Sequence, residues 1–216
     1  LTNGAAVAFP EDIADAILDV WYPGEEGGNA VANVIFGDKN PSGHLPVTFP
    51  KSTKDLPAFD NYSMKNRTYR YTTKEPLFPF GFGLSYTSFK FDSLDVKNTD
   101  AKSGKPDSWT MNVSANITNT GNLAGKNAVQ LYISKKERKS DDPICSLKQF
   151  KKIALKKSET KNVTFRLTSK DFESIDKNGN SVLVPGEYII TIADSVPTER
   201  SINLGATKPV SMVVRI

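Results

Sequence analysis

Two hydrophobic periodicities divide the chain. From about Thr87 onward, apolar residues alternate with polar ones in five separate runs. A period of two is typical of β-strands with one buried and one wet face, so the runs predict antiparallel sheets. The runs cover residues 109–117, 129–133, 163–167, 188–192 and 210–216. We expect the following side chains to lie largely inside: Trp109, Val113, Leu131, Phe165, Tyr188 and Ile190.

Turn-forming sequences separate these runs. They stand at residues 119–122, 177–180 and 185–186, and each contains glycine. About seven short strands over a segment of this length predict an immunoglobulin-like or fibronectin-like sandwich. Cys145 is the only cysteine, so the hallmark disulfide of immunoglobulin domains cannot form. The fibronectin variety is therefore favoured.

The first 40 residues have a helical period instead. Pro10 suits the first position of a helix, and the apolar residues after it recur at a helical spacing as far as Trp21. A second helix is predicted from about Glu25 to Gly37. The expected apolar faces are Ile13, Ile17, Leu18 and Trp21 in the first helix, and Ala30, Val31, Val34 and Ile35 in the second. Residues 38–86 are irregular, and the boundary to the sandwich is expected near residues 86–92.

Two helices with one apolar stripe each cannot bury those stripes without a sheet to pack on. The first four residues, Leu-Thr-Asn-Gly, read like the end of a strand that enters a turn. We therefore expect the chain to be part of a longer protein that supplies the sheet.

Composition excludes several kinds of site. The chain has 28 basic and 24 acidic residues, a net charge of +4, and its densest basic stretch, residues 135–139, is followed by Asp141 and Asp142. A solvated loop is thus favoured over a nucleic-acid site, which needs unopposed charge. No apolar run approaches the roughly 20 residues that span a bilayer. With one histidine, His44, and one cysteine, we expect neither a multi-histidine nor a cysteine-rich metal site.

Longer motifs follow one another in a recognisable order. The first is the run from Trp21 to Pro50, which contains WYPGEEGGNA and FGDKNPSGHLPVTFP; RTYRY at 67–71 and PLFPFGFGLSY at 76–86 come next. Shorter motifs lie in the sandwich segment: VQLY at 129–132, LKQFKK at 147–152 and VPGEY at 184–188. In this order they resemble the C-terminal part of glycoside hydrolases of family 3, the β-glucosidases and their relatives.

The resemblance implies an α+β chain with two parts. Residues 1–88 would be the C-terminal end of an α/β sandwich domain with an aromatic linker loop, and residues 89–216 an all-β fibronectin III-like sandwich. Such enzymes are retaining, exo-acting β-glycosidases, and a β-glucosidase acting on terminal non-reducing β-D-glucosyl residues is the first expectation. Hydrolysis by this class needs no metal or other cofactor. The alternative is a non-catalytic accessory module for domain packing, dimer contact or carbohydrate binding.

The resemblance also places the catalytic carboxylates outside this chain. The nucleophile of the family is an Asp on a barrel, and the acid/base is typically a Glu upstream of the Trp-Tyr-Pro-Gly motif. Both positions would precede Leu1, so no catalytic residue is assigned here, and the substrate-binding residues stay open. The expected partners are the barrel and α/β sandwich of the same enzyme, a β-linked oligosaccharide or glycoside, and a second copy in a homodimer, with neither nucleic acid nor membrane. The expected compartment is secreted or periplasmic.

Several residues allow more than one interpretation. Glu25 and Glu26, before Gly27-Gly28, indicate a tightly packed helix start or one wall of a polar pocket. His44 stands where similar sequences commonly have Arg, which favours a surface or hydrogen-bonding role over a proton shuttle. Aromatic residues crowd the segment before the sandwich and either line a sugar subsite or pack the interface between domains, together with Arg67 and Arg70. They are Tyr62, Tyr69, Tyr71, Phe78, Phe80, Phe82 and Tyr86. Glycosylation sequons at Asn61, Asn66, Asn112, Asn116 and Asn162 are ascribed to composition.

Overall fold

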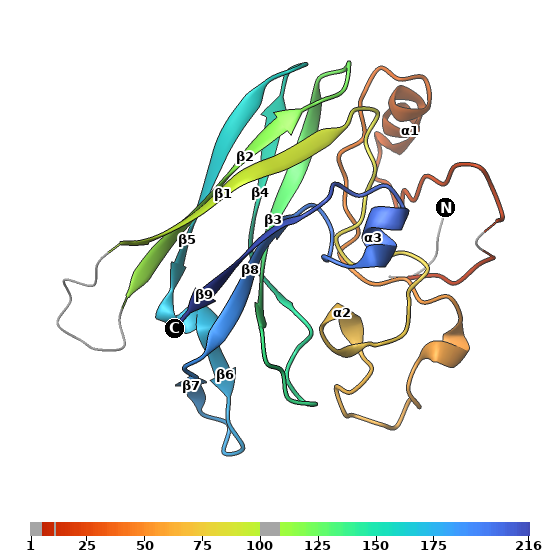
Figure 1. Cartoon of the computed structure of the whole chain (residues 1–216). Coiled ribbons are helices and arrows are strands. Elements are labelled where there is room, and N and C mark those ends of the chain that lie inside the picture. Colours follow the sequence, from red (N-terminus) through yellow and green to blue (C-terminus); the bar gives the residue numbers. More distant parts are fainter. Residues whose placement is uncertain (1–5, 11, 100–108) are drawn as a thin grey trace.

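A two-layered antiparallel sandwich forms most of the molecule, and the N-terminal part lies along one side of it (Figure 1). The computed structural model describes residues 6–10, 12–99 and 109–216. One sheet has the order β1-β2-β5 and the other β4-β3-β8-β9, with every neighbouring pair antiparallel. Their bounds are β1 Phe89–Thr99, β2 Thr110–Asn119, β3 Gly125–Lys135, β4 Ser146–Leu155, β5 Thr160–Thr168, β8 Glu187–Ala193 and β9 Val210–Arg215. The strands β6 (Glu173–Ile175) and β7 (Ser181–Leu183) form a small separate hairpin.

The core lies between the two sheets, as the alternation predicts. Burial on β2 follows a strict period of two, with Met111, Val113, Ala115 and Ile117 inside. Of the six side chains expected inside, five are buried: Val113, Leu131, Phe165, Tyr188 and Ile190. Trp109 is only half-buried and packs against Phe172 at the end of the core, with 5.2 Å between ring centroids.

Of the seven strands in the two main sheets, β1 and β4 were not among the five predicted runs. In β1 the period is interrupted at Ser93, where the backbone takes a left-handed φ of 53° and the register with β2 shifts. In β4 lysines occupy positions where apolar residues would alternate, because β4 is an edge strand whose side chains reach solvent.

The first predicted helix is wrong. Residues 12–22 contain no helix, and Ile13, Ile17 and Leu18 are 60%, 44% and 44% exposed. A short helix in water gains most of its stability from packing an apolar face, and in this stripe only Trp21 packs on a described residue, Phe49, while the other three side chains stay exposed. The second helix is confirmed as α1 (Gly27–Ile35), and Gly37 follows it with a φ of 84°.

Further helical elements are short. They are the 3₁₀ turns Thr53–Asp55 and Ser169–Phe172, and the helices α2 (Thr68–Tyr71) and α3 (Glu199–Asn203). No helix within the described ranges is long and apolar enough to cross a membrane. The helix α2 belongs to the N-terminal part and α3 to the sandwich segment, and both lie where the two parts meet (Figure 1).

Candidate functional site

The contact surface between residues 40–86 and the sandwich, called the seam below, is built from the motifs of the irregular segment. Two of these motifs run alongside each other: Leu45 donates its N–H to the Phe82 carbonyl, and Gly81 donates its N–H to the Leu45 carbonyl, both at 2.8 Å. Phe49 and Phe78 form a further antiparallel bridge. The motifs are thus hydrogen-bonded to each other as well as packed on the sandwich.

Glycine allows this pairing at two positions. A Cβ on Gly83 would come within 2.1 Å of the Gly43 carbonyl oxygen, so only glycine permits the backbones to approach this closely. Gly81 has a φ of 76°, and a Cβ there would meet the side chain of Gln130 at 2.4 Å. Both glycines therefore set the distance between the loop and its neighbours.

Gln130 of β3 is the central polar residue of the seam. Its side chain is buried, and its Nε2 donates to the Gly81 carbonyl at 3.1 Å and to the Asp194 carbonyl at 2.7 Å. Its Oε1 accepts the hydroxyl proton of Tyr132 at 2.5 Å. One amide on β3 therefore joins the N-terminal loop to Asp194, the residue that follows β8.

Aromatic packing covers this polar centre. The ring of Tyr69 stacks on Phe80 with 4.2 Å between centroids and meets Tyr132 edge-on at 6.2 Å. The Tyr69 hydroxyl accepts a hydrogen bond from the Leu147 N–H at 3.0 Å, and burial raises the pKa of Tyr69. These contacts favour interface packing for this part of the aromatic segment. Tyr62 is 91% exposed and takes no part in the packing.

The arginine that ties the seam together is not one of the two expected. Arg200 of α3 donates to the carbonyls of Pro76 and Leu77 at 3.2 and 2.9 Å. Arg67 instead donates to carbonyls of its own loop, those of Ala58, Asn61 and Ser63. Arg70 contributes its carbonyl, which accepts the Ile144 N–H at 2.6 Å.

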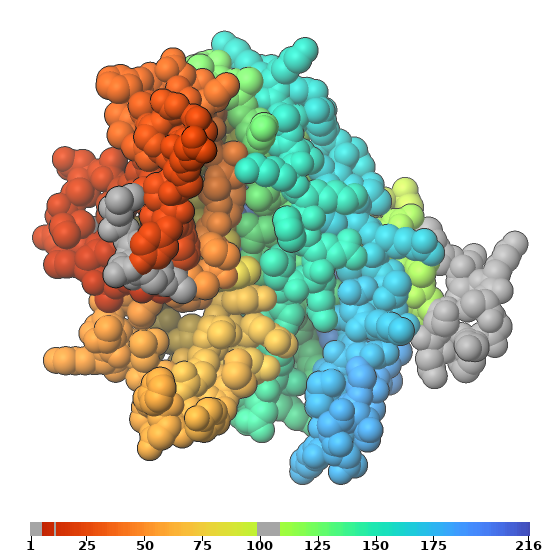
Figure 2. Space-filling view, turned by 180° about the vertical axis from the view of Figure 1, so that it is seen from behind, coloured from red at the N-terminus to blue at the C-terminus, as the bar shows by residue number. Residues whose placement is uncertain are grey.

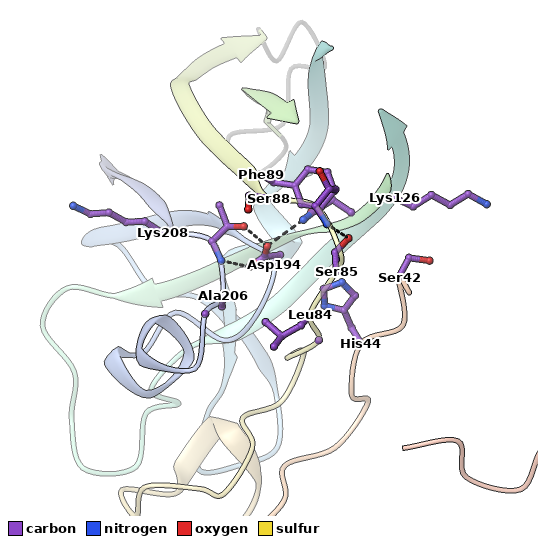
Figure 3. Close-up of a pocket in the computed structure, with 15 residues that line it drawn as sticks. Ser42, His44, Leu84, Ser85, Ser88, Phe89, Lys126, Asp194, Ala206 and Lys208 are labelled. Atoms are coloured by element: carbon purple, nitrogen blue, oxygen red, sulfur yellow. Dashed lines mark hydrogen bonds between the residues drawn. The ribbon is translucent and has the colours of Figure 1, made fainter. Parts of the chain in front are cut away.

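A polar cavity of about 300 Å³ opens at the seam (Figure 3). Loop residues, among them Ser42, His44 and Ser85, face sandwich residues, among them Asn127 and Asp194. The side chains of Lys126 and Lys208 extend away from the cavity in Figure 3. A ligand in the cavity would therefore meet mainly hydroxyl groups, the carboxylate, and the edges of Leu84 and Phe89.

Asp194 is held firmly in this cavity. Asn127 donates its Nδ2–H to Asp194 Oδ2 at 3.1 Å, and Thr207 donates its backbone N–H to Oδ1 at 3.1 Å and its hydroxyl to Oδ2. Asp194 is only 6% exposed, and the Oδ1 of Asn127 is buried without a hydrogen-bond partner in the structure. The carboxylate is thus committed to the structure of the seam.

His44 also has a structural role. Its Nδ1 lies 2.7 Å from the carbonyl oxygen of Gly81. A carbonyl can only accept, so Nδ1 carries the proton and donates it. The ring therefore helps to fix the turn that also binds Gln130, which agrees with a hydrogen-bonding role.

The cavity has no paired carboxylates. Asp194 is the one acidic residue among its described lining residues, whereas glycoside hydrolysis by two carboxyl groups requires a second one within about 5–10 Å. Nor do three His, Cys, Asp or Glu side chains gather anywhere in the part of the chain that the structure describes. This arrangement can bind and orient polar groups, but its described lining lacks the two carboxyl groups that would act as acid and base on either side of a glycosidic bond.

Glu25 and Glu26 lie away from this cavity. Both are exposed, and Glu26 immediately precedes α1, where its Oε2 accepts the Asn29 side-chain N–H at 2.6 Å. A Cβ on Gly27 would meet Pro23 at 2.4 Å, while one on Gly28 would meet nothing within 4 Å. The structure therefore fits a helix start that packs closely at Gly27.

Two sequon asparagines have a structural use. Asn116 of β2 and Asn162 of β5 are paired in register, and the Asn162 side chain donates to the Asn116 Oδ1 at 3.0 Å.

Three residues of the seam were not predicted from the sequence: Gln130, Asp194 and Arg200. The one signal in the sequence for Gln130 was the VQLY motif that contains it. In the structure both faces of β3 are buried at this point, the outer face with Gln130 as well as the inner face.

The fold and the seam together define a class of protein: a fibronectin III-like sandwich with a long N-terminal segment docked on its outer face. Comparison with known proteins gives the family. Residues 1–86 match the glycosyl hydrolase family 3 C-terminal domain, and residues 127–196 match the fibronectin type III-like domain. The chain belongs to glycoside hydrolase family 3 and corresponds to the C-terminal part of such enzymes.

The chain is similar to relatives named β-xylosidases and to relatives named β-glucosidases. A xylan 1,4-β-xylosidase of Xylanibacter ruminicola is 42% identical over 196 residues, which cover 89% of this chain and 22% of that protein. A periplasmic β-glucosidase of Salmonella typhimurium is 35% identical over 207 residues, covering 89% and 26%. The crystal structure of a β-glucosidase from Kluyveromyces marxianus in complex with glucose superposes with a TM-score of 0.74 at 32% identity, covering 90% of this chain and 24% of that one. The chain thus spans about a quarter of the length of these relatives.

Proposed function

We propose that the chain is the C-terminal part of a retaining, exo-acting β-glycosidase that releases terminal non-reducing β-linked sugars. The observation that supports this most directly is the match of both parts of the chain, in order, to the two C-terminal domains of family 3. The reaction would be a double displacement through a covalent glycosyl-enzyme. The role of this chain would be structural, because the seam fixes the position of the N-terminal part on the sandwich.

The two catalytic carboxylates belong, in this proposal, to the part of the enzyme that precedes Leu1, with the nucleophile Asp on a barrel domain. The relatives support it, since they are about four times as long as the region that they share with this chain. The remaining domains of the same enzyme would be the principal partners. A location outside the cytoplasm is proposed because the Salmonella relative is a periplasmic β-glucosidase.

The sugar released is proposed to be β-D-glucose. The β-glucosidases among the similar solved structures, including one in complex with glucose, support this choice. A β-xylosidase is the second candidate, because the relative with 42% identity is named for xylan. The two sugars differ by a hydroxymethyl group, which residues of the barrel would accept or exclude.

The test compares the 216-residue chain with the full-length protein on aryl β-glucosides and aryl β-xylosides. We expect the chain alone to show no turnover above background, and the full-length protein to hydrolyse one of the two with retention of configuration. Turnover by the pure chain that survives a contaminant check would contradict the proposed position of the carboxylates. A full-length protein that hydrolyses neither substrate would favour the accessory-module alternative.

A further inference from the structure

The positive charge of the chain is concentrated on two neighbouring edge strands. Between Ser146 and Thr168, which covers β4, β5 and the turn between them, there are seven basic residues and one acidic residue, a formal charge of +6. The whole chain has a net charge of +4, so the residues outside this segment carry a net charge of −2 (+4 less +6). The basic residues are Lys148, Lys151, Lys152, Lys156, Lys157, Lys161 and Arg166. These seven residues and Phe150 are together called the basic edge.

The basic edge is exposed and weakly opposed. All of its basic residues except Lys148 are exposed. Among the described residues, no carboxylate lies within ion-pair distance of Lys152, Lys156 or Lys157, and Glu159 pairs with Lys161 at 3.4 Å. Burial lowers the pKa of Lys148, while the nearby carboxylates Asp171 and Glu173 act against that shift. Figure 2 shows β4 and β5, in turquoise to cyan, across the middle of the face turned to the reader.

Side chains close the gap between the two strands. Lys151 and Gln149 of β4 donate to the carbonyls of Thr164 and Arg166 on β5, and Lys161 of β5 donates to the Ala154 carbonyl of β4 at 2.7 Å. These bonds occupy carbonyl groups that an edge strand would otherwise offer to an added strand. The edge is therefore not built to pair with another β-strand. The ammonium groups of Lys151 and Lys161 are thereby held in place, which reduces the entropy lost when these two lysines bind a ligand.

An aromatic ring stands beside these charges. Phe150 is 67% exposed, and it shares the outer face of the sheet with Lys152 because side chains two apart on a strand point the same way. In the pairing of β3 with β4, Ala128 lies opposite Lys152. A small side chain therefore stands next to Lys152 on the adjacent strand.

We propose that the basic edge binds an acidic polysaccharide, one whose sugar units carry carboxylate groups. An extended strand of ten residues is about 30 Å long, and Lys152 lies on the outer face of β4. Lys156 and Lys157 follow at its end, so these lysines offer positive charge along a line that an extended polymer can follow. Carboxylates would pair with the lysines, and the Phe150 ring would pack against the apolar face of a sugar. This inference rests on the proposed function, since a sugar-releasing enzyme meets such polymers.

Nucleic acid is the other polyanion that such a surface could attract. Six of the seven basic residues are lysines, whereas the paired, planar recognition of phosphate is a property of arginine. The exposed ring is single, which gives no succession of stacking platforms for bases. These two features favour carboxylate-bearing sugars.

The test measures binding of the 216-residue chain to oligogalacturonate by calorimetry, with neutral xylo-oligosaccharide and single-stranded DNA of equal length as comparisons. We expect oligogalacturonate to bind, with an affinity that falls as salt is added. The triple variant K152Q/K156Q/K157Q should bind about tenfold more weakly, because each exposed charge pair contributes modestly. Phe150→Ala should weaken binding without changing its salt dependence.

A control triple, K39Q/K65Q/K208Q, removes three exposed lysines elsewhere and should leave binding unchanged. Thermal unfolding of each variant checks that the sandwich is intact. The proposal is overturned if oligogalacturonate does not bind, if the control triple weakens binding equally, or if DNA binds more tightly. Hydrolysis of aryl glycosides by the full-length enzyme is a separate readout, so failure of this proposal and failure of the proposed function are distinguishable.

Discussion

Gln130 holds the seam through a single buried amide. Replacing it with leucine keeps the approximate volume but leaves the Tyr132 hydroxyl and the Asp194 carbonyl without this partner. A buried polar group that loses its hydrogen bond costs about 1–3 kcal/mol, so we expect Gln130→Leu to lower the free energy of unfolding by about 3 kcal/mol. Urea denaturation followed by circular dichroism measures the change.

Gln149 on the adjacent strand provides the matched control. Its amide donates to the Arg166 carbonyl at the solvent-exposed edge, where water can replace it. Gln149→Leu should therefore cost less than about 1 kcal/mol. Equal losses in the two variants would mean that the hydrogen bonds of Gln130 are not what stabilises the seam.

Cys145 gives a second measurement at the scale of one residue. It is buried in the apolar cluster of the seam, with Tyr132 and Val196, and burial raises the pKa of its thiol to about 12. The thiolate is the form that reacts, so iodoacetamide at pH 8 should label the folded chain very slowly and the urea-unfolded chain rapidly. Mass spectrometry at intervals follows the labelling. Labelling of the folded chain at the unfolded rate would show that the seam is open in solution.

At the scale of elements, two glycines in different surroundings make a matched pair. Gly83→Ala would place a Cβ 2.1 Å from the Gly43 carbonyl oxygen, and the paired backbones must then separate. Overpacking of this kind costs about 2 kcal/mol. Gly28→Ala adds a Cβ in open space within α1, where alanine favours the helix by up to about 1 kcal/mol. We expect the melting temperature to fall for the first variant and to hold or rise for the second.

The contrast between β2 and β4 shows what could be predicted about the elements. On β2 one face is buried and the other wet, so the period of two was readable and the residues inside were predicted. On β4 lysines replace the apolar residues, so the period of two is lost. In β1 the irregularity at Ser93 adds one residue, which shifts the alternation to the other face. The helix expected over residues 10–21 failed for a related reason, since a period alone does not supply the surface on which a helix packs.

The seam could be predicted only in part. Packing at a domain contact was one of the two interpretations of the aromatic segment, and Tyr69 and Phe80 do pack there. Gln130 and Arg200 were not found, because their partners are backbone carbonyls far away in the sequence, at Gly81, Pro76 and Leu77. Nothing in the local pattern of a chain marks a polar side chain that bonds to distant backbone.

At the scale of the whole molecule, the two parts of the chain differ in how much apolar surface they bury. The sandwich has a closed core, whereas Ile13, Ile17, Ile35 and Phe36 are all exposed in the N-terminal part. Exposed apolar residues gathered on one segment mark a contact surface, and local stability is low where few apolar contacts hold the backbone. We therefore expect the N-terminal part to open far more often than the sandwich.

Hydrogen exchange on the 216-residue chain tests this expectation. Amides of residues 12–36, including those of α1, should exchange many times faster than those of β2, β3 and β8, which are hydrogen-bonded on both sides. In the full-length protein the same amides should slow markedly, because the proposed α/β sandwich would cover the apolar stripe, while the amides of the sandwich strands should change little. Strong protection of residues 12–36 in the monomeric chain would contradict the prediction. It would mean that the contacts at Trp21, Phe49 and Phe78 are sufficient to hold this part closed by themselves.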